Sequence, residues 1–161
     1  MPVRVAGRGW RFGEAIMKIV VVGSGKVGSR LAMELVEEGH EVTIIARTTE
    51  SLHRLPESFT GRIVVGLGMN RYVLEEAGIR EAEALAAVTE DDSLNIAAAK
   101  VAKEQFGVLR VVSRIYDPEL AEFYMQQGIA TICPTRMVVG RAKESLFAPI
   151  GPVKSDAEGV C

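Results

Sequence analysis

The chain has 161 residues, enough for one domain with its own core, and its 19 basic and 21 acidic side chains leave a net charge of −2. This balance excludes the strongly basic surface of a nucleic-acid-binding protein and a polybasic membrane anchor, so we expect no nucleic-acid partner. Cys133 and Cys161 lack the spacing of a metal site, and no apolar stretch approaches the roughly 20 residues that cross a bilayer. We therefore expect a cytoplasmic protein without direct membrane insertion.

Residues 1–16 fit none of the expected elements. They contain three arginines and Trp10, the only tryptophan, and they lack the apolar stretch of a secretory signal. We interpret residues 1–16 as an N-terminal extension, either absent from the native protein or disordered, and Met17 as the beginning of the fold. Residues 148–161 form a C-terminal tail without periodicity.

From Met17 onward, short apolar runs alternate with segments of helical periodicity. Strands are expected at residues 17–22, 42–45, 62–65, 84–88, 111–112 and 130–132. Helices are expected at residues 26–38, 49–54, 71–77, 91–106 and 118–127, and from a cap at Thr135 to about Phe147, the segment 91–106 being the longest. This alternation predicts an α/β fold, a doubly wound parallel six-stranded sheet in a single domain spanning residues 17–147.

A glycine-rich turn joins the first strand to the first helix. Its sequence is Gly23-Ser24-Gly25-Lys26-Val27-Gly28. In such a turn one glycine permits the tight bend, a second lets the backbone approach a phosphate, and a third lets the helix pack close to the strand. The helix directs its N-terminal N–H groups at the anion, and Lys26 adds an ammonium group within reach. The motif, in this context, predicts a Rossmann-like site for a dinucleotide pyrophosphate.

The end of the second strand carries no carboxylate for a ribose. In a dinucleotide-binding fold this position, about 20 residues past the glycine turn, normally supplies an acid to the ribose hydroxyls. This chain has Ala46, Arg47 and Thr48 there, and Glu50 comes several residues late. A guanidinium pairs bidentately with phosphate, so Arg47 favours a 2′-phosphate, and hence NADP(H) or another phosphate-rich nucleotide over NAD(H). The alternative is that Arg47 is an ordinary solvated side chain.

Three further residues follow strands on the same edge of the predicted sheet. Thr89 and Glu90 come after the fourth strand, and Arg114 comes after the fifth. Open α/β sheets bind ligands in the crevice at the carboxyl ends of their strands. These residues are therefore candidates for the nucleotide site by position.

The residues that commonly carry catalysis are not placed for it. His40 follows a helix stop and His53 belongs to a surface helix, so neither is expected at the crevice. Cys133 has no evident base partner, and Tyr116 lacks a lysine four residues later. With no second domain to hold a substrate, we expect a nucleotide sensor without catalytic residues or a metal site, not an enzyme.

Several longer stretches resemble one known family, in the family's order. They are MKIVVVGSGKVGSRLA at 17–32, VLEEAGI at 73–79, AVTEDDSLN at 87–95, SRIYDPELAEFY at 113–124 and ICPT at 132–135. From Met17 to about Phe147 the chain looks like the nucleotide-binding N-terminal domain of TrkA-type potassium-uptake regulators, known as the RCK, KTN or TrkA-N domain. The resemblance implies a ligand such as NAD(H), ADP or ATP, whose occupancy gates a membrane potassium transporter or channel.

The resemblance also implies roles for individual positions. Gly23 through Gly28 would hold the phosphates, Thr89 and Glu90 would line the adenosine side, and Arg114 would approach the phosphates or the distal half of the ligand. The chain departs from the family where Ala46 replaces the usual aspartate of the ribose position. It departs again where Gly66-Leu67-Gly68-Met69 replaces a common glycine-aspartate-x-threonine stretch. The family's C-terminal ligand-sensing lobe is also expected to be absent, because about fourteen residues follow the last helix.

We therefore expect a cytoplasmic regulatory subunit, peripheral to the membrane through its partner, that gates a potassium transporter or channel by binding NAD(H), NADP(H), ADP, ATP or AMP. The family forms dimers or rings, so a homodimer or larger ring, alone or with a paralogous subunit, is expected. Its contact would be the last helix, whose apolar residues would otherwise pack on their own sheet: Met137, Val138, Val139, Leu146 and Phe147. Two alternatives remain open, an NADP-dependent oxidoreductase subunit and a degenerate scaffold that pairs with a full-length paralogue.

Overall fold

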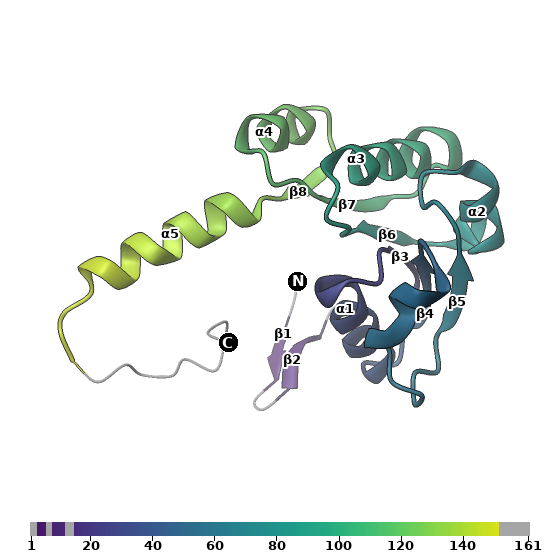
Figure 1. The fold of residues 1–161 in the computed structure, drawn as a ribbon, viewed down its shortest axis with the longest axis horizontal. Coiled ribbons are helices and arrows are strands. Elements are labelled where there is room, and N and C mark those ends of the chain that lie inside the picture. The colour runs from purple at the N-terminus through teal and green to yellow at the C-terminus, as the bar shows by residue number, and fades with distance from the viewer. Residues whose placement is uncertain (1–2, 6–7, 12–14, 152–161) are drawn as a thin grey trace.

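Six strands pair side by side in one parallel sheet. The computed structural model describes residues 3–5, 8–11 and 15–151. The strands are β3 (Lys18–Val22), β4 (Glu41–Ala46), β5 (Arg62–Val65), β6 (Ala84–Ala87), β7 (Arg110–Arg114) and β8 (Ala130–Ile132). Their order in space is β5-β4-β3-β6-β7-β8, and every neighbouring pair is parallel (Figure 1). The predicted doubly wound, single-domain α/β fold is confirmed, with the strand order reversing between β3 and β6.

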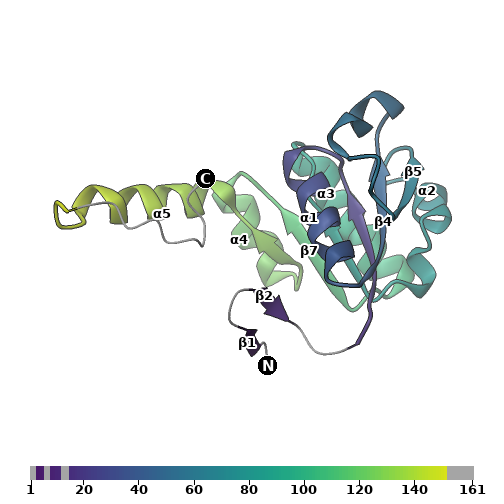
Figure 2. The same ribbon diagram turned by 90° about the horizontal axis from the view of Figure 1, so that it is seen from below.

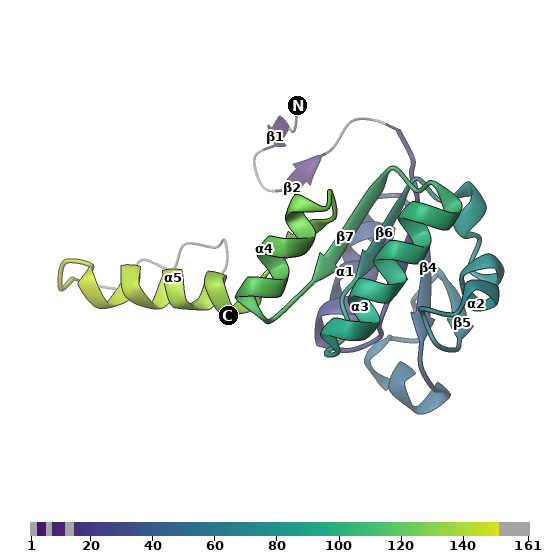
Figure 3. The ribbon, with the colours of Figure 1, turned by 90° about the horizontal axis from the view of Figure 1, so that it is seen from above.

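Helices cover both faces of this sheet. They are α1 (Lys26–Glu37), α2 (Arg71–Glu76), α3 (Asp92–Lys100), α4 (Pro118–Gln126) and α5 (Pro134–Phe147). Shorter turns are the 3-10 helices η1 (Thr49–Arg54) and η2 (Ile79–Glu81) and the π-helical segment η3 (Val101–Gln105). Figure 2 looks onto α1, whereas Figure 3 looks from the opposite side onto α3 and α4.

The alternation of side chains along β3 builds two apolar cores. Ile19 and Val21 face α1 and pack with Ala32, whereas Val20 and Val22 face α2 and α3. Successive side chains of a strand point to opposite faces, so a continuous apolar run is what a strand covered on both sides requires. Four of the five β3 residues are buried accordingly, and the carboxyl end of the strand is held in the middle of the sheet.

The starts of α3 and α4 follow the expected capping signals, but the predicted segment 91–106 differs in its second half. Asp91 caps α3 by accepting from the Leu94 N–H, and Asp117 caps α4 just before Pro118. The predicted segment 91–106 is helical over 92–105 but changes from α to π geometry at Val101, so α5 is the longest uninterrupted α-helix. A π turn changes the hydrogen-bond spacing of a helix, which apolar periodicity does not register.

The N-terminal extension was wrongly predicted to contain no element. Val3–Val5 (β1) and Arg8–Arg11 (β2) pair as a two-stranded antiparallel sheet, separate from the six-stranded sheet. The residues between and around these strands lie outside the described part of the chain, as do residues 152–161 of the tail. Whether residues 1–16 belong to the native protein remains a prediction.

Helix α5 leaves the edge of the sheet after β8 and extends away from the other elements (Figures 1 and 3). It begins at Pro134 because proline suits the first helical position, so the N-cap is Cys133 and the prediction of Thr135 as the cap is wrong. Thr135 instead donates its hydroxyl to the Tyr116 carbonyl at 2.7 Å. Arg136 pairs with Glu122 of α4 at 3.0 Å, and this hydrogen bond lowers the pKa of the Glu122 carboxyl. The base of α5 is thereby tied to α4.

The rest of α5 makes little contact with the domain. No residue of the helix is buried against the described chain, and the exposed fraction is 67% for Val138 and 77% for Leu146. The alternative that these apolar side chains pack on their own sheet is therefore wrong. No helix among the described residues has the length and apolar content to span a bilayer.

Candidate functional site

A cavity of about 600 Å³ lies at the carboxyl ends of β3 and β6. This is the point where the strand order reverses, which is where open α/β sheets bind their ligands, and the volume falls in the usual range of small-molecule sites. Nine of the residues predicted from the sequence line it. They are Gly23, Ser24, Gly25, Lys26, Val27, Arg47, Thr89, Glu90 and Arg114. Gly28, Ala46 and Thr48 do not.

The glycine turn is shaped by close backbone contacts. Gly23 has φ +112°, a conformation that side chains other than hydrogen rarely adopt, and its N–H donates to the Ile45 carbonyl of β4. A Cβ on Gly28 would lie 1.8 Å from the Gly23 carbonyl oxygen, so Gly28 supports the turn from below instead of lining the cavity. A Cβ on Gly25 would meet nothing within 4 Å. Space is therefore left over Gly25 on the side from which a phosphate would approach.

The N-terminus of α1 opens into this space. Gly25 occupies the N-cap position, and no side chain accepts a hydrogen bond from the first N–H groups of the helix. Those groups and the positive end of the helix dipole make a ready site for an anion. Lys26 is exposed at the first helical position and brings a positive charge to the same edge. The turn therefore fits the pyrophosphate or phosphate of a nucleotide.

The side of the cavity formed by β6 and β7 is held by one buried side chain, Asn95 of α3. Its Oδ1 accepts from the Thr89 N–H at 2.9 Å and from the Thr89 hydroxyl at 2.7 Å. Its Nδ2 donates to the carbonyls of Thr89 and Arg114, both at 2.9 Å. Asn95 is fully buried, so these bonds join the ends of two neighbouring strands with little competition from water.

Arg114 belongs to the same network. Its Nε donates to the Thr89 carbonyl at 3.0 Å, and its guanidinium lies 4.9 Å from the centre of the Tyr116 ring. Only 7% of Arg114 is exposed. Part of the guanidinium is thus committed to holding the Thr89 loop, although the residue also lines the cavity.

The side of the cavity formed by β4 has a different construction. Ala46 is fully buried and lies outside the cavity lining, while Arg47, the next residue, lines it. The Ser24 hydroxyl donates to the Ser51 hydroxyl at 2.9 Å, and Ser51 donates to the Thr48 carbonyl at 2.7 Å. These two bonds fix η1 against the glycine turn. Thr48 therefore contributes its carbonyl to the loop and not a side chain to the cavity.

Two polar residues of η1 that line the cavity were not predicted from the sequence, Ser51 and Arg54. Residues three apart on a 3-10 helix lie on the same side, so Arg54 shares the face of Ser51. That spacing was a usable signal, but only once the segment is known to be 3-10. Leu67, Leu94 and Tyr116 also line the cavity and supply apolar surface.

The residues judged unsuited to catalysis lie away from the cavity, except Tyr116. His40 is at the amino end of β4, where its Nδ1 accepts from the Met17 N–H at 3.2 Å. His53 is exposed on η1 and points its Nδ1 to the Glu50 carbonyl. Cys133 is buried as a free thiol, with Sγ 3.5 Å from the Tyr116 carbonyl oxygen. None of these three residues contributes to the cavity lining.

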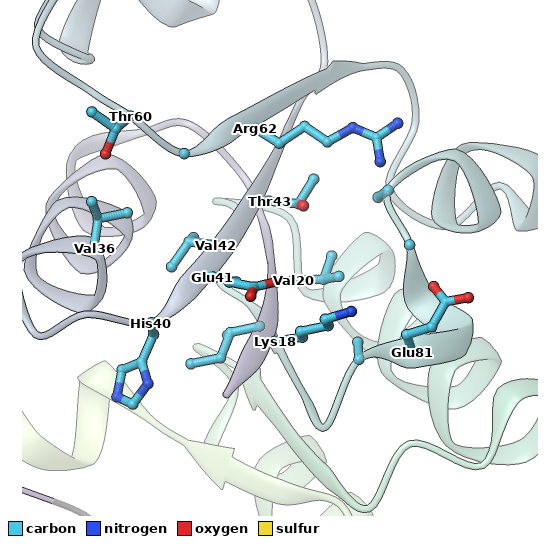
Figure 4. Close-up of a pocket in the computed structure, with 15 residues that line it drawn as sticks. Lys18, Val20, Val36, His40, Glu41, Val42, Thr43, Thr60, Arg62 and Glu81 are labelled. Atoms are coloured by element: carbon cyan, nitrogen blue, oxygen red, sulfur yellow. The ribbon is translucent and has the colours of Figure 1, made fainter. Parts of the chain in front are cut away.

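A second cavity, of about 380 Å³, lies at the opposite, amino ends of β3, β4 and β5. Figure 4 shows Lys18 extending towards Glu81, with Thr43 and Arg62 above them. Its charged lining mixes both signs, since Lys18 and Arg62 accompany Glu41 and Glu81. The end of the sheet and the mixed charge both make it a weaker candidate for a nucleotide than the cavity at the glycine turn.

Comparison with known proteins identifies the sequence family. The model of the TrkA-N domain matches residues 19–134. Over 120 residues the chain is 51% identical to the Trk system potassium uptake protein TrkA of Streptomyces coelicolor, an alignment that covers 74% of this chain and 54% of that protein. The chain thus spans about half the length of this curated relative.

Solved structures share the fold. The TrkA-N domain of the inner membrane protein ybaL from Escherichia coli has a TM-score of 0.71 and 18% identity, covering 84% of this chain and 100% of that one. The C-terminal domain of Kef from Shewanella denitrificans, in an AMP-bound form, has a TM-score of 0.66 and 20% identity, covering 80% of this chain and 79% of that one. At these identities the likeness establishes the fold alone.

Proposed function

The chain belongs to the TrkA-N domain family, and we propose that it is a nucleotide-binding regulatory domain of a potassium transport system, acting through ligand occupancy and not through catalysis. The observation that carries this proposal is the cavity at the β3–β6 switch point, with a helix N-terminus that no side chain caps. The relative at 51% identity is named for potassium uptake, which supports the choice of system.

The ligand proposed for the cavity is an adenine nucleotide. The turn and the amides of α1 supply phosphate contacts, Lys26 supplies a charge, and Leu67 and Leu94 offer apolar surface against which a base can lie. The AMP-bound Kef domain of the same fold supports this class of ligand. Within the class, NAD(H), NADP(H), ADP, ATP and AMP all contain the adenosine phosphate that the turn would hold.

The regulatory output is proposed to pass to a membrane potassium transporter or channel, with this domain on the cytoplasmic side. A ligand changes such an equilibrium only if it binds one state of the assembly better than another. The loop Thr89–Asp91 lines the cavity and is joined to α3 by the hydrogen bond to Asn95 and by the Asp91 cap. A ligand that moves this loop would therefore also move α3. Shifts of α3 relative to its neighbours are the proposed signal.

Helix α5 is proposed as the contact with a second copy of the chain. Val138, Ala142 and Leu146 are spaced four residues apart and therefore lie along one face, and Val139 adjoins it. All four are exposed in the isolated chain. Two such helices that pair along this face would cover apolar surface that the domain itself leaves in water.

Titration calorimetry of the purified chain with NAD, NADH, NADP, NADPH, AMP, ADP and ATP tests the function. We expect saturable binding of at least one nucleotide and no turnover of carbonyl substrates in its presence. Binding of none would favour the scaffold alternative. NADPH preference combined with turnover of a carbonyl substrate would favour the oxidoreductase alternative instead.

Sedimentation velocity tests the contact through α5. Val138→Glu places a charge in the apolar face and is expected to shift the protein from dimer or larger assembly to monomer. Gly140→Glu is the matched control, because it adds the same charge where a Cβ meets nothing within 4 Å and Gly140 lies off that face. A wild-type monomer, or equal effects of both variants, would contradict the proposed contact.

A further inference from the structure

Among the residues that the structure describes, none on the β4 side of the cavity offers a carboxylate to ribose hydroxyls. Ala46 replaces an acid at the strand end, and Glu50 is not part of the cavity lining. The Glu50 carboxylate instead accepts from its own backbone N–H and from the Thr48 hydroxyl, which lowers its pKa. Glu90 and Asp91 do line the cavity, but they follow β6 on the other side of the glycine turn.

Two arginines line the cavity on the β4 side, where no acid of the described chain does. Arg47 directly follows β4 and Arg54 ends η1, and both line the cavity together with Ser51. The Ser24–Ser51 hydrogen bond holds η1 beside the glycine turn, so both guanidinium groups border the site where the pyrophosphate is proposed to bind. Among the described residues, neither arginine forms an ion pair or a side-chain hydrogen bond.

A pair of uncommitted guanidinium groups has a defined chemical preference. Each presents a planar fork of donors that matches phosphate oxygens, and neither can accept a hydrogen bond from a ribose hydroxyl. In dinucleotide-binding folds the adenosine ribose lies at the carboxyl end of the second strand of the parallel sheet, which is β4 here. An arginine at this place accommodates a 2′-phosphate. In the proposed complex, Lys26 and the α1 amides bind the pyrophosphate, so Arg47 and Arg54 remain available to bind another phosphate.

We propose that the cavity takes an adenine nucleotide with a phosphate on the 2′-oxygen of its ribose, NADP(H) among the dinucleotides, and that Arg47 and Arg54 bind this phosphate. The inference rests on the proposed nucleotide-binding function and names its ligand class. It adopts the phosphate-binding interpretation of Arg47, because Arg54 also lines the cavity and Glu50 does not.

The sharpest probe is a pair of small nucleotides that differ only in the phosphate concerned, adenosine 2′,5′-bisphosphate and AMP. Isothermal titration of the whole chain is expected to show tighter binding of the bisphosphate by about tenfold to a hundredfold, the range of one or two charge-assisted hydrogen bonds. NADP is expected to exceed NAD by a similar factor, because the two dinucleotides differ by the same group.

Three arginine variants assign the effect. Arg47→Ala and Arg54→Ala are each expected to remove most of the preference for the bisphosphate while the affinity for AMP changes little. Arg62→Ala is the matched control, since Arg62 is also exposed and lies at the amino end of β5, away from this cavity. Thermal unfolding measures whether each variant folds, and all three are expected to fold because the substituted side chains are exposed.

The outcomes separate this inference from the proposed function. Equal affinity for AMP and the bisphosphate overturns the 2′-phosphate subsite and leaves nucleotide binding in place. A preference that survives both arginine variants overturns the assignment to Arg47 and Arg54. Failure of every nucleotide to bind overturns the proposed function together with the inference.

Discussion

The two sides of the cavity are built in opposite ways. On the β6 and β7 side, Asn95 is fully buried and its amide joins Thr89 to the backbone of Arg114 by four hydrogen bonds. On the β4 side, Arg47 and Arg54 are exposed, and among the described residues their guanidinium groups form no ion pair or side-chain hydrogen bond. The polar groups of the β6 and β7 side are therefore part of the buried core, whereas the arginines of the β4 side lie on the surface.

The difference implies that the buried side maintains the cavity, whereas the exposed side determines which ligand the cavity prefers. In a buried, fully bonded network, a substitution that removes one partner lowers the free energy of unfolding, because it leaves a polar group with neither water nor protein to bond to. Substitution of an exposed arginine changes the free energy of unfolding by no more than about 0.5 kcal/mol. Sites built this way keep their cradle while the residues that choose the ligand are free to vary.

The largest expected effect lies in the glycine turn that both sides share. Gly28→Ala places a Cβ 1.8 Å from the Gly23 carbonyl oxygen, a backbone atom that cannot rotate away, and is expected to cost about 3 kcal/mol or more in the free energy of unfolding. Urea unfolding followed by circular dichroism measures this. Full stability in Gly28→Ala would show that the turn is looser than its geometry indicates.

Gly25→Ala is the control within the same turn and has the opposite signature. Its φ of −72° suits any residue and its Cβ meets nothing within 4 Å, so stability is expected to be unchanged. Nucleotide affinity measured by calorimetry is expected to fall, since the methyl group enters the space over the turn. Unchanged affinity would place the phosphate elsewhere.

The second effect concerns the buried side alone. Asn95→Ala removes the side-chain partner of the Thr89 N–H and of the Arg114 carbonyl, whereas the Thr89 carbonyl still accepts from Arg114, and is expected to lower the free energy of unfolding by about 2–4 kcal/mol. Ser113→Ala is the control, because the Ser113 hydroxyl is buried and has no hydrogen-bond partner among the described residues. Its loss is expected to be neutral or stabilising by up to about 1 kcal/mol. Similar losses in both variants would deny Asn95 a special role.

The sheet and the glycine turn could be predicted because their signals are local. Val20-Val21-Val22 followed by spaced glycines specifies a buried strand and a tight turn within ten residues, and parallel strands place their carboxyl ends together. Thr89 and Arg114 could thus be assigned to the cavity from position alone. Arg47 also lines the cavity, whereas Ala46 does not, and the assignment of the ribose to this end of β4 stays a prediction.

The remaining features depend on contacts that no local pattern contains. Asn95 looks like any polar residue of a helix until Thr89 and the end of β7 are brought beside it. Arg54 joins the cavity only because η1 is a 3-10 helix tied to Ser24. Helix α5 has the apolar residues of a core helix, yet the described chain provides nothing to cover them.

The smallest expected effect distinguishes the two kinds of positive charge on the open side. Lys26→Ala removes a point charge beside the pyrophosphate that all the candidate dinucleotides share, so their affinities are expected to fall together, by about threefold to tenfold, with no change in stability. Arg47→Ala instead changes the ratio between NADP and NAD. Calorimetric titration of both dinucleotides against both variants measures the two effects in one experiment. If Lys26→Ala altered the ratio, the 2′-phosphate would lie nearer the turn than η1, and Lys26 would have to be counted with the arginines that select the ligand.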